Sequence, residues 1–294
     1  VEQAKKNLRR EIKNYKLKDV ATAGRKIWND ELGKIQVAGG TQNDKFVFYT
    51  SLYRCLERPV NISEDGYYFS VYDNKVHEDA GYDYYTDDWI WDSYRAAHPL
   101  RILMDQKKQT NIIRSYLRMS ELSSDHWFPN FPEVTGDSRR MNCNHGVAII
   151  ADAWYKGLRD FNLQEAYVYT KAGIEEKTLA PWSSAQSGWI DQFYKEKGYI
   201  PSLIPGEKET VPEVNSFEKR QSVAVTLGTS YDQWCLSRIA AALGLKTEAD
   251  SYLSSSYNYR NLFNSKTLFC HPQDKDGYFI EPFDYRFSGG MGAR

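Results

Sequence analysis

Residues 221–243 read QSVAVTLGTSYDQWCLSRIAAAL, and residues 247–263 read TEADSYLSSSYNYRNLF. Both runs carry apolar residues at helical spacing and contain no proline. Gly244 stands just after the first run, at a position where glycine commonly ends a helix. The stretch therefore predicts two consecutive helices that pair across a short turn.

The same organisation recurs along the chain. Apolar residues at helical spacing predict further helices over Val20–Ile35, Phe48–Leu56, Trp91–Asp105, Thr110–Leu122, Gly146–Phe161 and Leu163–Leu179. Alternating residues from Gly66 to Val76 instead predict a small β-hairpin. We expect a mainly α fold, a toroid of helical hairpins of the (α/α)6-barrel type, with long aromatic loops gathered at one end.

Composition excludes several classes of function. The chain has 294 residues and a formal net charge of -1, which gives no electrostatic case for binding nucleic acid. It contains no apolar run approaching the roughly 18 to 20 residues of a transmembrane helix. Its four cysteines are widely spaced and are interpreted as free thiols. The last stretch, Phe283–Arg294, is predicted to be a loop.

The segment from Asp87 to Arg95 reads DDWIWDSYR and combines three carboxylates with two indoles. Two interpretations of Asp92 are open. It stands where a helix is predicted to begin, so its side chain can cap that helix. Alternatively, the segment forms a sugar subsite, in which a carboxylate accepts hydrogen bonds from hydroxyls while an indole covers the ring face. Arg95, one turn further on, is a potential ion-pair partner of Asp92.

Residues 136–146 read GDSRRMNCNHG and precede another predicted helix. His145 and Cys143 are too few for a zinc site, which takes three or four ligands. His145 is therefore interpreted either as a hydrogen-bonded structural histidine or as a substrate contact. Asp232 lies on a largely apolar helix, where a buried carboxylate needs polar partners, and a structural role is favoured for it.

Three classes of function remain open on these residues alone. A glycoside hydrolase needs a pair of carboxyl groups about 5 to 10 Å apart, and the sequence does not show which of its many Asp and Glu residues converge. A non-catalytic toroid would use the same Trp–Asp segment to bind a glycan without cleaving it. A helical scaffold would bind another protein instead, because a fold does not determine a function.

Taken together in order and spacing, the segments resemble glycoside hydrolase family 92, the calcium-dependent exo-acting α-mannosidases. The resemblance covers nearly the whole chain. It is carried by VAGG (Val37–Gly40), FYTSLYR (Phe48–Arg54), WDSYR (Trp91–Arg95) with His98-Pro99-Leu100, His145-Gly146 with IADA (Ile150–Ala153), YDQWC (Tyr231–Cys235), NYRNLF (Asn258–Phe263) and Pro282-Phe283-Asp284.

The resemblance implies that residues 1–294 form part of a single (α/α)6 catalytic domain, which in this family normally follows a β-sandwich domain. It implies inverting, calcium-dependent release of terminal α-linked mannose from mannose-containing oligosaccharides or N-glycans, with α-1,2 linkages expected first. It also implies a periplasmic, cell-surface or secreted location.

The resemblance further assigns roles to individual residues. Trp91 and Asp92 are expected to line the subsite of the terminal mannose. Arg95, His98 and His145 are expected near or behind it. The family's general acid Glu, in a motif similar to E-x-[NS]-A-W-Q-Y, and its general base Asp are expected beyond Arg294, so no catalytic residue is expected within this chain. The calcium ligands are not named by the sequence.

Overall fold

The structure, a computed structural model, describes residues 1–284 and 286, so most of the predicted Phe283–Arg294 loop lies outside the described residues. The fold is mainly α, as predicted. Its helices are α1 (Glu2–Glu11), α2 (Leu17–Leu32), α3 (Gln42–Leu56), α4 (Ile90–Ser93), α5 (Ala97–Met104), α6 (Gln106–Leu122), α7 (Gly146–Tyr155), α8 (Leu163–Glu175), α9 (Trp189–Lys197), α10 (Ser222–Ala242) and α11 (Lys246–Ser255), followed by the short 3-10 helix η1 (Asn258–Leu262).

Strands in the described residues form only short antiparallel pairs. β1 (Val60–Asn61) pairs with β4 (Tyr85–Thr86), β2 (Tyr67–Ser70) with β3 (Lys75–Glu78), β5 (Pro132–Glu133) with β6 (Gly136–Asp137), and β7 (Phe263–Asn264) with β8 (Phe269–Cys270). The β2–β3 pair confirms the predicted hairpin. Its turn contains Asn74 with a φ of 58°, a conformation that asparagine tolerates better than most residues.

The core lies where α6, α7, α8 and α10 pack together, with α10 in contact with α7, α8 and α11. The largest side chains that are fully buried include Ile112, Tyr116, Ile149, Ile150, Leu236 and Ile239. Helices α10 and α11 form the hairpin that the sequence predicts. A second, smaller cluster, including Ile190, Tyr194 and Val225, packs α9 against the beginning of α10. Burial of these apolar side chains is the main force that holds the helices together.

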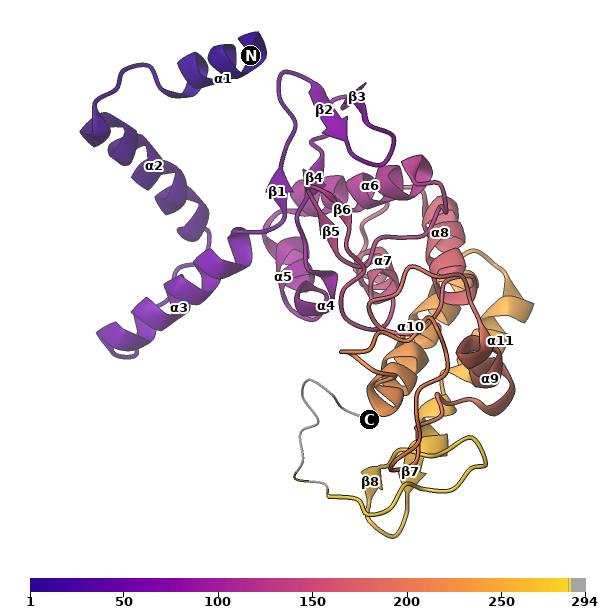
Figure 1. Ribbon diagram of the computed structural model, residues 1–294. Helices are drawn as coiled ribbons and strands as arrows, with labels where there is room; N and C mark the ends of the chain where they lie inside the picture. The colour runs from indigo at the N-terminus through magenta and orange to yellow at the C-terminus, as the bar shows by residue number, and fades with distance from the viewer. Residues whose placement is uncertain (285, 287–294) are drawn as a thin grey trace.

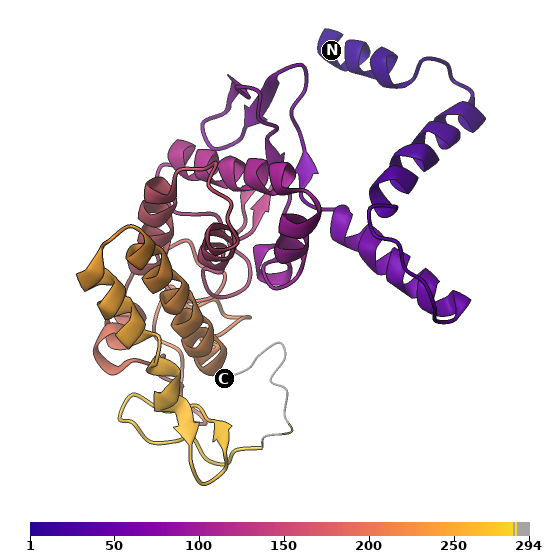
Figure 2. The same ribbon diagram turned by 180° about the vertical axis from the view of Figure 1, so that it is seen from behind.

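Helices α1 to α3 extend away from this body as an arm (Figures 1 and 2). None of the side chains of α2 is buried, and Ile27 and Trp28 on it are exposed. The helices of the described residues do not close into a ring.

One predicted helix is interrupted. The sequence predicted a single helix over Trp91–Asp105, whereas the structure has α4 and α5 with a break at Ala96. The physical reason is Pro99, which has no backbone N–H to donate to the carbonyl of Arg95 and whose ring would clash with that carbonyl. Proline is tolerated in the first turn of a helix, and it lies there in α5.

Other boundaries differ by a few residues, and two helices were not predicted. The helix predicted over Gly146–Phe161 ends at Tyr155, two residues before Gly157 with its φ of 98°. The helix predicted over Thr247–Phe263 ends at Ser255 and is continued by η1. The unpredicted helices are α1 and α9. Among the described residues, no helix has both the length and the apolar character needed to cross a membrane.

The beginning of α7 is fixed by a close helix–loop contact. A Cβ added to Gly146 would lie 2.4 Å from two ring atoms of Phe128, so only glycine fits there. The ring of Phe128 is buried in the main core. His145 is the residue immediately before α7, so this contact is one of those that position it.

Candidate functional site

A cleft of about 490 Å³ lies where the beginnings of α7 and α10 meet α4. It joins the three segments that the sequence singled out. Its lining residues are Trp91, Tyr94, Arg95, Asn142, His145, Ala224, Leu227, Gly228 and Tyr231. The four from α10 have the spacing of one helix face.

His145 is held rigidly at the floor of this cleft. Its Nδ1 lies 2.7 Å from Oδ1 of Asp232, while the backbone N–H of Asn144 donates to Oδ2 of the same carboxylate at 2.7 Å. Asp232 is only 1% exposed, so the structural role favoured for it fits its surroundings. Because the carboxylate accepts from Nδ1–H, the neutral imidazole has an unprotonated Nε2. Within the described residues Nε2 has no hydrogen-bond partner, so it is available to accept a hydrogen bond from a ligand.

Aromatic rings surround this imidazole. The ring centroid of Tyr94 lies 4.2 Å from that of His145, and Tyr231 approaches it edge-on at 6.1 Å. Burial raises the pKa of both tyrosines, so their hydroxyls stay protonated. The indole of Trp91 donates from Nε1 to Oδ1 of Asn142 at 3.2 Å, which orients the ring at the rim of the cleft.

Three of the five predicted site residues line the cleft: Trp91, Arg95 and His145. Two details of the prediction are wrong. Asp92 does not cap α4, because the N-cap is Trp89 and no side chain caps that helix. Arg95 does not pair with Asp92 but donates from Nε to the hydroxyl of Tyr94 at 2.7 Å.

Asp92 is exposed and is not among the residues that line the cleft. It is the third residue of α4. Partial burial and the nearby charge of Asp88 raise the pKa of its carboxyl. Its side chain has no ion-pair partner in the part of the chain that the structure describes, which leaves it free to bind a ligand.

His98 lies beneath the cleft rather than in it. It is 1% exposed, and its two ring nitrogens contact Asp88 at 2.7 Å and Gln109 at 3.1 Å. The same Asp88 carboxylate accepts a hydrogen bond from Tyr116. Burial alone would raise the pKa of Asp88, but His98 and Arg101 hold it below its usual value. This network anchors the segment that carries Trp91.

Tyr94, Asn142, Gly228 and Tyr231 were not named as site residues from the sequence. Tyr94 and Tyr231 lie inside segments that the sequence singled out, so aromatic content near His145 was a usable signal. Asn142 and Gly228 also lie inside such segments, but neither residue type points to a sugar site, because their place in the cleft depends on contacts between distant parts of the chain.

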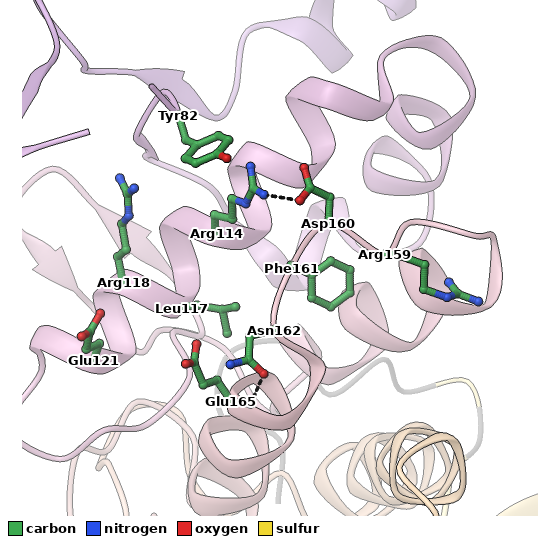
Figure 3. Close-up of a pocket in the computed structure, with 10 residues that line it drawn as sticks. All are labelled: Tyr82, Arg114, Leu117, Arg118, Glu121, Arg159, Asp160, Phe161, Asn162 and Glu165. Atoms are coloured by element: carbon green, nitrogen blue, oxygen red, sulfur yellow. Dashed lines mark hydrogen bonds and ion pairs between the residues drawn. The ribbon is translucent and has the colours of Figure 1, made fainter. Parts of the chain in front are cut away.

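A second hollow, of about 530 Å³, lies between α6 and the beginning of α8 (Figure 3). It shares no residue with the cleft. Arg114 at its centre lies 3.7 Å over the ring of Tyr82 and pairs with Asp160 at 2.6 Å. Two charged residues at this hollow are thus already paired with each other.

We expect Asp160→Asn to leave substrate turnover unchanged and to alter the free energy of unfolding by less than about 1 kcal/mol, because the Asp160 side chain is 79% exposed and exposed ion pairs contribute little. Steady-state kinetics and urea unfolding of the full-length protein check this. A tenfold loss of kcat/KM would indicate instead that the functional site lies at this hollow.

Residues 1–284 and 286 contain no group of three or more His, Cys, Asp or Glu side chains placed to hold a metal ion.

The chain is thus a mainly α domain of helical hairpins, with an aromatic cleft at the beginnings of its helices. The model of the glycosyl hydrolase family 92 catalytic domain matches residues 3–292, so the chain belongs to family 92. This confirms the resemblance found in the sequence.

Two solved structures illustrate the likeness. An inverting mannosidase of family GH92 from Bacteroides thetaiotaomicron VPI-5482 is 30% identical with a TM-score of 0.81, and the match covers 96% of this chain and 36% of that one. A GH92 α-mannosidase from Bacteroides thetaiotaomicron is 24% identical with a TM-score of 0.78, over 95% of this chain and 34% of that one. The latter enzyme has also been solved with mannoimidazole.

The chain spans about a third of the length of these solved structures. A search of the curated proteins found no match.

Proposed function

We propose that this chain is part of the catalytic domain of a glycoside hydrolase that releases terminal α-linked mannose from mannose-containing oligosaccharides or N-glycans. The observation that carries the proposal is the cleft, in which Trp91 and two tyrosines surround a fixed imidazole on a family 92 fold. Sugars are bound by aromatic faces against C–H groups and by directed polar groups against hydroxyls.

Four residues in or beside the cleft contact the sugar in this proposal. The half-exposed indole of Trp91 packs on one face of the sugar ring. Nε2 of His145 accepts a hydrogen bond from a sugar hydroxyl, since Nδ1 is committed to Asp232. The exposed guanidinium of Arg95 donates to hydroxyl oxygens at the rim. Asp92 on α4 accepts from a hydroxyl outside the cleft wall.

We propose an inverting reaction with α-1,2-linked mannosides as preferred substrates. Inversion uses a carboxylic acid that protonates the leaving oxygen and a carboxylate that activates water, roughly 6.5 to 9.5 Å apart. We assign both groups, a Glu and an Asp, to the enzyme beyond Arg294, in line with the family resemblance. Residues 1–294 then contribute binding and orientation.

Calcium dependence is part of the proposal, with ligands drawn at least in part from beyond the described residues. When bound, calcium would supply a cation that coordinates sugar hydroxyls. We expect chelation to lower mannose release by the full-length enzyme more than tenfold and added calcium to restore it. Full activity after exhaustive chelation would contradict this dependence.

Mannose release from α-1,2-mannobiose by the full-length protein tests the main proposal, with the anomer of the first product followed by NMR. We expect β-mannose to form first. Binding of the disaccharide without turnover would replace the proposal with a non-catalytic glycan-binding protein. Release of α-mannose as the first product would overturn the inverting mechanism alone.

We also propose a periplasmic, cell-surface or secreted location, which cell fractionation tests.

A further inference from the structure

The turn Met141–Asn144 rests on the first two turns of α10 through a contact that allows only one combination of side-chain sizes. A Cβ added to Gly228 would lie 2.1 Å from Sγ of Cys143 and 3.1 Å from its Cβ. Cys143 therefore occupies the space that any side chain at residue 228 would need. Because Sγ belongs to a short, buried side chain rather than a flexible one, it cannot move aside easily.

The same turn is connected to both groups that face the ligand in the proposed function, the indole of Trp91 and the imidazole of His145. On one side of Cys143, Asn142 accepts a hydrogen bond from the indole of Trp91 at 3.2 Å and donates to Oε1 of Gln221 at 2.7 Å. On the other side, Asn144 and His145 are held by Asp232 of α10. The distance between this turn and α10 thus affects the positions of both the indole of Trp91 and the imidazole of His145.

The backbone of the turn is held in a costly conformation. Met141 and Cys143 have φ values of 66° and 67°, in the left-handed region that favours glycine. Such strain persists only where the surroundings impose it, and it gathers at functional sites. Here the surroundings include the hydrogen bonds of Asn142 and the seat of the thiol over Gly228.

We propose that Cys143 and Gly228 are matched positioning residues, in which the thiol seated over Gly228 fixes the spacing between α10 and the groups that bind the sugar. The inference rests on the proposed function, because the sugar is the ligand. The thiol acts by its size and not as a nucleophile. Burial, with the nearby Asp232 carboxylate, raises the pKa of Cys143 well above its usual value, so it stays protonated.

Three variants of the full-length protein test the proposal: Gly228→Ala, Cys143→Gly and the double variant. Alanine normally favours a helix interior over glycine, so any loss in Gly228→Ala comes from the clash with the thiol. Gly24→Ala in α2 is the matched control, because nothing lies within 4 Å of the added methyl in the described residues.

We expect Gly228→Ala to raise KM for α-1,2-mannobiose about tenfold and to change kcat less than threefold, because the displaced groups bind substrate while the acid and base lie elsewhere. We expect the double variant to recover KM to within about threefold of the wild type, because glycine at residue 143 removes the thiol and suits a φ of 67°.

An unchanged KM in Gly228→Ala, or a double variant no better than the single one, would overturn the proposal. If the double variant recovered Tm but not KM, Cys143 and Gly228 would form only a packing contact, and their positioning role would be overturned. If the wild type released no mannose, the proposed function would fail. The pairing itself would then still be judged from whether Cys143→Gly restores the Tm that Gly228→Ala loses.

Discussion

Replacing His145 by asparagine is expected to lower kcat/KM for mannose release by roughly 30- to 150-fold while leaving the fold intact. The amide nitrogen of asparagine can take the place of Nδ1 and keep the hydrogen bond to Asp232, but asparagine has no atom where Nε2 lies. The variant therefore removes only the group that faces the ligand. A lost polar contact in a desolvated site costs about 2 to 3 kcal/mol, which corresponds to this range.

His145→Gln is the matched variant. Its amide reaches the place of Nε2 but loses the hydrogen bond of Nδ1 to Asp232. We expect it to keep more activity than His145→Asn and to lose more stability, because the Asp232 carboxylate, which is 1% exposed, then lacks one of its two partners. Steady-state kinetics and urea unfolding separate the two effects.

Wild-type kinetics in His145→Asn would contradict the assignment of Nε2 to the substrate. It would leave His145 as the structural histidine that the sequence also allowed. Equal loss of activity and of stability in both variants would have the same consequence. The two interpretations left open by the sequence are thus decided by one pair of substitutions.

The sequence predicted the scaffold better than the site. Helices with long apolar stripes, such as the pair α10 and α11, follow from local periodicity and were found. The break between α4 and α5 depends on a single proline, and the short α9 has a mixed pattern. Both are cases in which one residue or a tertiary contact outweighs periodicity.

The site residues that the sequence found stand inside recognisable motifs, as Trp91 and His145 do. Those it missed are defined by contacts between distant segments. The bond between Trp91 and Asn142 spans 51 residues, and the bond between His145 and Asp232 spans 87. The clash that makes Gly228 necessary is visible only in three dimensions. One sequence contains no signal for such pairings.

The placement of His98 shows how a motif residue can support a site without entering it. The resemblance to family 92 led us to expect it near or behind the sugar. In the structure it is buried against Asp88, the residue four positions before Asp92. The contact between Asp88 and His98 therefore connects the beginning of α5 to the segment that carries Trp91.

Asp88→Ala is accordingly expected to destabilise the protein by about 3 to 5 kcal/mol, since removing one partner of a buried pair leaves the other without compensation. The substitution would leave Nε2 of His98 and the hydroxyl of Tyr116 unpaired inside the core. Asp87→Asn is the matched control. Its side chain is 25% exposed, its φ of 66° suits asparagine, and it should cost less than about 1 kcal/mol.

The pH dependence of this loss of stability tests whether the negative charge of Asp88 causes it. The pKa of Asp88 is lowered in the folded protein, so at acid pH the folded chain holds fewer protons on this carboxyl than the unfolded chain does. Its contribution is therefore fully present above the unfolded pKa of about 3.9 and is lost as pH falls toward the folded value. Urea unfolding should show a difference in the free energy of unfolding between wild type and Asp88→Ala that shrinks as pH falls below about 4. A difference that stayed constant through acid pH would assign the loss to packing and would contradict an ionised anchor beneath the cleft.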